Sequence, residues 1–138
     1  MLKRVAKMPH THEQGASFEF AYLTLAAFYI EKNKFDLAQD LCKRCLQYNA
    51  SCAKAHKMLG SIFELELAYK DAADAYERAW RITQRGSPSL GYQLSFNYLK
   101  AKRYVEAIDV ANDVIKRFPT YPGIREDVLE IAMRSLKP

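Results

Sequence analysis

One pattern of small and aromatic residues recurs three times along the chain, and it constrains the fold more than any other feature. Its most regular members are Ala38, Ala72 and Ala107, which are 34 and 35 residues apart. Each repeat also holds an earlier small residue and an aromatic residue three positions later: Ala26 with Tyr29, Gly60 with Phe63, and Ser95 with Tyr98. A period of this length predicts stacked helical units, because a single unit cannot bury its own apolar face.

The pattern resembles the tetratricopeptide repeat, in which each unit is a pair of antiparallel helices. Small residues are expected where the two helices cross, since larger side chains would push the helices apart. The expected fold is all-α, a right-handed superhelix of antiparallel helix pairs, with repeats at 18–52, 53–87 and 88–121. The expected helices span 18–32, 35–48, 53–66, 69–83, 89–101 and 104–118, and the last ends before Pro119.

The two ends of the chain differ in character. Residues 1–9 are predicted to be the tail of a preceding repeat helix, because Val5 to Pro9 is similar to Ile115 to Pro119, and residues 10–17 are expected to form a polar loop. The helix at 18–32 is apolar on nearly all sides, which indicates burial against several neighbours. We therefore expect a C-terminal piece of a longer solenoid that self-associates or dissolves poorly when isolated.

Residues 122–138 are expected to close the solenoid with a capping helix at 123–136. This helix is amphipathic, and a polar outer face is typical of the terminal helix of a solenoid. The residues expected to face inward are Ile124, Val128, Ile131 and Ala132.

Composition excludes several classes of protein. The net charge of +5 comes from basic and acidic residues that are interleaved, so it predicts a solvated surface rather than a nucleic-acid site. The most apolar stretch, Phe18 to Ile30, is too short for a membrane span and contains Glu19. The sequence shows no secretory signal, and its three cysteines favour a reducing intracellular compartment and argue against a disulfide framework.

The candidate metal and redox motifs are weak. Cys42 and Cys45 have redox-motif spacing, but they occupy mid-helix positions of the repeat, where small buried residues are expected. Cys52 lies in a turn with no second pair to complete a zinc site. His10 and His12 have no clear third ligand, and His56 is expected to pack in an aromatic position. We therefore expect no metal, no cofactor, no small-molecule substrate and no catalytic site.

The first helices of the repeats are expected to line a concave groove that binds protein partners. Helical phase assigns twelve residues to it: Phe20, Leu23, Ala27, Ile30, Lys54, Lys57, Ser61, Glu64, Tyr92, Phe96, Leu99 and Lys100. Equally, the apolar members could pack against neighbouring helices. Some tetratricopeptide repeats bind the C-terminal carboxylate of a partner through lysine, asparagine and arginine at set helix positions. Counted from the first repeat, these positions hold Leu23, Ala27 and Met58, and counted from the second they hold Lys57, Ser61 and Gln93. Only Lys57 is suitable, so no such carboxylate site is expected.

Longer strings carry a second, more specific resemblance. They are the residues from Leu2 to Pro9, from Lys43 to Leu46, from Tyr69 to Ala73, from Gly91 to Asp109, from Tyr121 to Arg125 and from Ser135 to Pro138. Together they resemble the C-terminal end of the large tetratricopeptide-repeat subunit of intraflagellar transport complex A, the ciliary tetratricopeptide repeat protein 21 family. The polar loop at 10–17 is the least typical part.

This resemblance implies a scaffold for retrograde ciliary transport and for admission of cargo to the cilium. The implied partners are other subunits of the complex, built from WD-repeat propellers and helical solenoids, and the implied location is the cytoplasm, the cilium and its basal body. The alternative is a generic adaptor that binds a short peptide or helix in its groove, independently of cilia.

Overall fold

The computed structural model describes residues 12–136, which form helices and the turns between them. The expected helix tail at 1–9 and His10 lie outside the described residues. The helices are α2 (His12–Glu31), α3 (Phe35–Tyr48), α4 (Ala53–Leu65), α5 (Tyr69–Ile82), α6 (Pro88–Lys100), α7 (Tyr104–Arg117), the π-helical η1 (Arg125–Leu129) and α8 (Glu130–Leu136).

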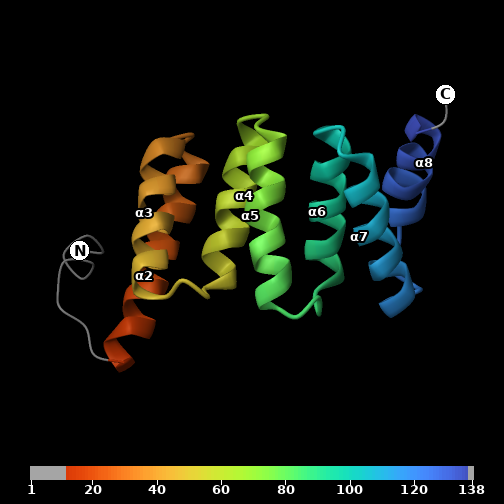
Figure 1. Cartoon of the computed structure of the whole chain (residues 1–138). Helices are drawn as coiled ribbons and strands as arrows, with labels where there is room; N and C mark the ends of the chain where they lie inside the picture. The colour runs from red at the N-terminus through yellow and green to blue at the C-terminus, as the bar shows by residue number, and fades with distance from the viewer. Residues whose placement is uncertain (1–11, 137–138) are drawn as a thin grey trace.

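The helices form antiparallel pairs that stand side by side in chain order, from α2 and α3 at one end to α8 at the other (Figure 1). The pairs α2–α3, α4–α5 and α6–α7 fall within the three segments predicted as repeats, and each pair also packs against the next. This arrangement confirms the predicted all-α helical solenoid.

Small residues allow the close helix contacts. Ala38, Ala72 and Ala107 are fully buried, as the repeat predicted. Gly60 has no room for a larger side chain, because a Cβ there would lie 2.8 Å from ring atoms of Tyr76. The helix pairs therefore approach each other at the predicted positions.

Each repeat turns between its two helices in the same way. Asn33, Leu67 and Lys102 follow the first helices of the repeats, and their φ angles are 60°, 63° and 64°. A single left-handed residue after a helix is a common way to end it, although glycine is the usual choice. The recurrence of this turn shows that the repeat extends to backbone conformation.

The start of α2 differs from the prediction. The helix begins at His12, so residues 12–17 are helical where a polar loop was expected. These residues include Glu13, Gln14 and Ala16, all of which are good helix formers, and no proline follows Pro9 until Pro88. Polarity alone was therefore a poor reason to expect a loop.

The capping helix is present but its inward face was partly wrong. Its first turn is π-helical, and the backbone N–H of Glu130 bonds to the carbonyl of Arg125, five residues earlier. A wider turn shifts the helical phase. Leu129 is consequently buried, whereas Ile131, which was expected to face inward, is 37% exposed.

None of the helices in the described part of the chain combines the length and the apolarity that a membrane span requires.

Candidate protein-binding groove

The groove was predicted on the first helices of the repeats, α2, α4 and α6. All twelve predicted residues are at least partly exposed on these helices. The most exposed large apolar side chain among them is Phe20, at 72%. Their surroundings differ greatly from one repeat to the next, so each repeat is described in turn.

The first repeat contributes most of an open groove between α2 and α4, with a volume of about 700 Å³. Four predicted residues line it together: Phe20, Leu23, Ala27 and Lys54. The groove also includes four residues that the sequence did not predict: Glu19, Thr24, Cys52 and Ala53. Glu19 and Thr24 each adjoin a predicted residue on α2, so allowing a wider helical face would have found them. Cys52 and Ala53 depend on how α4 begins, which helical phase does not encode.

The lining of this groove is largely apolar, with one acidic residue, Glu19, and one basic residue, Lys54. Phe20, Leu23 and Ala27 present an apolar strip, and the exposed Lys54 stands at its edge. Such a surface fits the apolar face of an amphipathic helix or an extended peptide with an acidic residue near its anchor. Ile30 lies near the other end of α2, where it is partly buried in the core around Ala26 and Ala38.

In the second repeat, two predicted residues are held in a hydrogen-bond network and are not free to bind a partner. Glu64 Oε1 accepts hydrogen bonds from Tyr76 Oη at 3.4 Å and from Asn97 Nδ2 at 2.9 Å. Ser61 Oγ lies 3.2 Å from the same Tyr76 hydroxyl. Burial raises the pKa of Tyr76 to about 12, and the charge of Glu64 adds to this shift. Lys57, by contrast, is exposed.

In the third repeat, the predicted residues form a ladder along α6. The rings of Tyr92 and Phe96 stack with centroids 6.4 Å apart, and Lys100 Nζ lies 5.5 Å above the Phe96 ring. Tyr92 also donates a hydrogen bond of 2.7 Å to Asp127 Oδ2 in the capping segment. Leu99 is half-buried against the neighbouring core.

Tyr92 therefore contributes to attachment of the capping helix. Its ring also contacts Tyr121, at 6.2 Å between centroids, in the loop that leads to the cap. Burial and the bond to Asp127 raise the pKa of Tyr92 to about 12. The sequence missed this role because the contact joins residues 35 positions apart. The third-repeat residues do not line the groove between α2 and α4.

The cysteines and His56 are packed as expected. Cys42 and Cys45 are fully buried, and desolvation raises the pKa of the Cys42 thiol to about 12. His56 is buried, with Nε2 3.1 Å from the carbonyl oxygen of Ala50. The repeat positions, rather than the Cys-x-x-Cys spacing, therefore account for the burial of these residues.

Comparison with protein families identifies one family along almost the whole chain. Residues 1–133 match the family described as the tetratricopeptide repeat protein 21 C-terminal ARM domain. The chain is 51% identical over 137 residues to tetratricopeptide repeat protein 21B of Homo sapiens. It is 34% identical over 132 residues to the tetratricopeptide repeat protein 21 homolog of Caenorhabditis elegans. These matches cover 99% and 96% of this chain, and the chain spans only 10% of the length of each relative.

Two solved structures illustrate the similarity in fold. MamA superposes with a TM-score of 0.74 at 20% identity, covering 85% of this chain and 67% of MamA. YrrB, a tetratricopeptide-repeat protein described as having an unusual peptide-binding site, superposes with a TM-score of 0.70 at 20% identity, covering 83% and 58%. At this identity the likeness concerns the fold alone.

Proposed function

Because the chain belongs to the tetratricopeptide repeat protein 21 family, we propose that it is a non-catalytic protein-docking segment of intraflagellar transport complex A. In this proposal the whole protein acts in retrograde ciliary transport and in admission of cargo to the cilium. It works in the cytoplasm, the cilium and the basal body. The segment docks other subunits of the complex, which are built from WD-repeat propellers and helical solenoids.

The observation that carries the docking role is the apolar groove between α2 and α4. Phe20 exposes 72% of its surface there, beside Leu23 and the exposed Lys54. An exposed aromatic anchor next to a charged group is a common centre of a protein interface, because burying the ring supplies affinity and the charge supplies specificity.

The proposal is tested by affinity purification from ciliated cells. The tagged full-length protein is compared with a protein that lacks the segment corresponding to residues 12–136, and the partners are quantified by mass spectrometry. We expect the deletion to reduce recovery of WD-repeat subunits. Equal recovery from both proteins would contradict a docking role for this segment.

The second candidate is an adaptor that binds one soluble peptide in the same groove. The combination of an apolar strip and Lys54 favours it, since a peptide needs no larger surface. Charge reversal at Lys54 and Lys57 distinguishes the two. Loss of complex assembly supports the docking segment, whereas loss of a single peptide ligand from an intact complex supports the adaptor. Truncation of Phe96 is a further probe, but Tyr92 is unsuitable because it holds the cap.

A further inference from the structure

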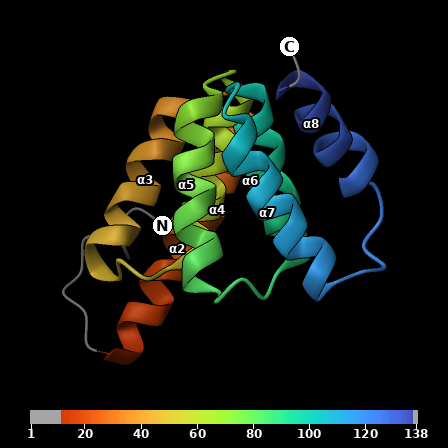
Figure 2. The same ribbon diagram turned by 45° about the vertical axis from the view of Figure 1, so that its right-hand side comes forward.

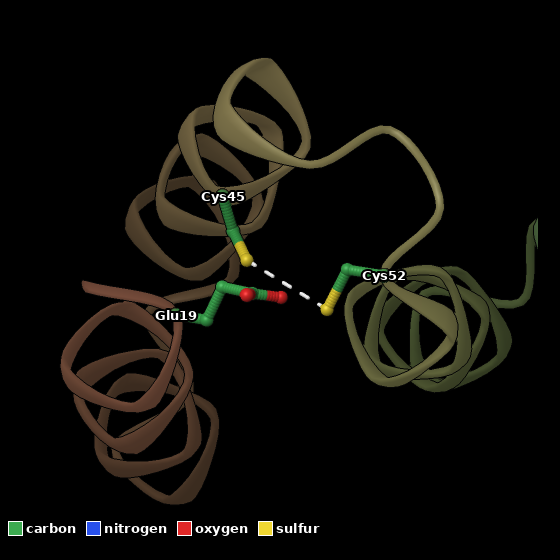
Figure 3. Close-up of side chains that lie close together, drawn as sticks. All are labelled: Glu19, Cys45 and Cys52. Carbon is green, nitrogen blue, oxygen red and sulfur yellow. Dashed lines mark hydrogen bonds between the residues drawn. The ribbon is translucent and has the colours of Figure 1, made fainter. Parts of the chain in front are cut away.

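Three potential metal ligands from three helical segments meet beside the groove: Glu19 of α2, Cys45 of α3 and Cys52 at the start of α4 (Figure 3). Their ligand atoms all lie within 4.8 Å of one another. The two sulfur atoms are 3.8 Å apart, and the carboxylate of Glu19 points toward them.

The distance between the sulfurs agrees with zinc coordination. In a tetrahedral site with Zn–S bonds of about 2.3 Å, two bound sulfurs are separated by about 3.8 Å. We propose that Glu19, Cys45 and Cys52 bind one zinc ion, with water as the fourth ligand. The ion would join α2, α3 and the beginning of α4, and so fasten the first repeat to the second.

A neighbouring amide orients the carboxylate. Asn49, in the turn between α3 and α4, donates a hydrogen bond from Nδ2 to Glu19 Oε1 at 3.2 Å. This bond orients the carboxylate, whose side chain points toward the two sulfurs. Such supporting hydrogen bonds are typical of metal sites, where they hold the ligands in position.

The site has a route to solvent and a protected interior. Glu19 and Cys52 both line the open groove, so an ion can reach them from solution. Cys45 is fully buried, and Cys52 is 7% exposed. This combination provides access on one side and excludes bulk water on the other.

A disulfide between Cys45 and Cys52 is the competing use of this pair, and the thiols are poorly suited to it. Disulfide formation requires the two sulfurs to approach to about 2.05 Å, and it also requires an oxidant to accept two electrons. Zinc displaces the thiol protons as it binds and requires little movement from 3.8 Å.

The sequence analysis expected no zinc because it considered Cys42 with Cys45 and found no second pair of cysteines to complete a site. Cys42 is one helical turn away on α3 and has the familiar spacing, but the group of ligands does not include it. The ligands come instead from three segments that the fold brings together. Cys42 is therefore the matched control: an equally buried thiol outside the proposed site.

The test uses the full 138-residue chain, purified without a histidine tag and dialysed against metal-free buffer. Zinc is measured by elemental analysis, and cobalt is added as a spectroscopic substitute. We expect one zinc per chain and, with cobalt, a thiolate-to-metal charge-transfer band. Absence of stoichiometric zinc together with absence of that band would overturn the proposal. So would a mass two hydrogens below that of the thiol form together with a cross-linked peptide that contains Cys45 and Cys52, since these identify a disulfide between the two proposed ligands.

The variants separate zinc binding from folding. Glu19→Gln and Asn49→Ala alter half-buried or exposed residues, so helicity should be retained. Asn49→Ala removes a supporting hydrogen bond and is expected to weaken zinc binding by about 10- to 100-fold, and Glu19→Gln removes a ligand and should weaken it at least as much. Cys45→Ser and Cys52→Ser should abolish the charge-transfer band, whereas Cys42→Ser should keep it. A band that persists in both Cys45→Ser and Cys52→Ser, or is lost only in Cys42→Ser, would refute the assignment.

Discussion

The side-chain amide of Asn97 on α6 donates a hydrogen bond of 2.9 Å to Glu64 Oε1 on α4, and so ties the second repeat to the third. Asn97 is fully buried, and its Nδ2 also donates to the carbonyl oxygen of Gln93 at 2.7 Å. The same Glu64 oxygen accepts from Tyr76, so one carboxylate links three helices. Although Glu64 was predicted to face the groove, its carboxylate therefore serves to hold α4, α5 and α6 together.

Asn97→Ala tests this link. We expect it to lower the free energy of unfolding by about 1–3 kcal/mol, because it leaves a partly buried carboxylate with one donor fewer. Glu64→Gln is the control, since its amide oxygen can accept the same bonds and the loss should be smaller. Urea denaturation followed by circular dichroism measures both. Equal stability of Asn97→Ala and wild type would contradict the structural role.

Gly91→Ala tests the close approach of α6 to its neighbours. A Cβ at Gly91 would collide with Val114 and would lie 2.9 Å from the ring of Trp80. Overpacking of this kind costs about 1–3 kcal/mol. The higher helix propensity of alanine stabilises the folded state by at most about 1 kcal/mol. We therefore expect net destabilisation, seen as a lower midpoint in thermal melting.

The matched control combines Gly91→Ala with Val114→Ala, which removes the side-chain atoms that the new methyl group would collide with. Val114→Ala alone should be destabilising, because Val114 is fully buried. Combined with Gly91→Ala, it should cost less than the sum of the two single changes. Strict additivity of the two free energies would show that the contact between Gly91 and Val114 does not limit packing.

The π-helical turn predicts which residues of the capping helix are buried, and alanine substitutions at Leu129 and Ile131 test that prediction. Leu129 is 7% exposed and Ile131 is 37% exposed. Leu129→Ala should therefore cost about 2–5 kcal/mol, as for other buried leucines. Ile131→Ala should cost about 1 kcal/mol or less, because much of its side chain is already in water. A larger loss at Ile131 than at Leu129, in chemical denaturation, would support a continuous α-helix with the originally predicted face.

The raised pKa of Tyr76 predicts that the free energy of unfolding falls at alkaline pH. Burial raises its pKa in the folded protein to about 12, from an ordinary value of 10.0. The folded state thus keeps a proton that the unfolded chain releases above about pH 10, and stability falls as the pH rises from 10 toward 12. Below pH 10 this residue contributes no pH dependence.

The measurement compares melting temperatures of wild type and Tyr76→Phe between pH 8 and pH 11.5. The other buried tyrosines titrate in both proteins, so the difference between the two curves isolates Tyr76. We expect the wild type to lose more stability above pH 10 than the variant. Parallel curves would show that Tyr76 titrates normally in the folded protein.

The repeat pattern was sufficient to predict most of the fold. The spacing of Ala38, Ala72 and Ala107 fixed the register of the helix pairs, and all three are buried at helix contacts. Such residues are informative because a crossing point accepts few side chains. The π-helical turn before Glu130 was not predictable in this way, since helical phase assumes a constant number of residues per turn.

The candidate site was less predictable than the fold. Phe20, Leu23 and Ala27, which helical phase assigned to the groove, line the open groove between α2 and α4. Helical phase could not show that Glu64 is held by Asn97 or that Tyr92 is held by Asp127. Those bonds join residues 33 and 35 positions apart, and they depend on the relative placement of whole repeats.

The most direct test of the docking role places a charge in the groove of the tagged full-length protein. Phe20→Asp and Lys54→Glu alter residues that line the groove, whereas Val105→Asp alters an exposed residue of α7 outside it and serves as the control. The measurement is the amount of each WD-repeat subunit that co-purifies from ciliated cells. We expect a loss of about tenfold or more for both groove variants, as for a hot-spot residue, and no loss for the control. Wild-type recovery with Phe20→Asp and Lys54→Glu would contradict docking through this groove.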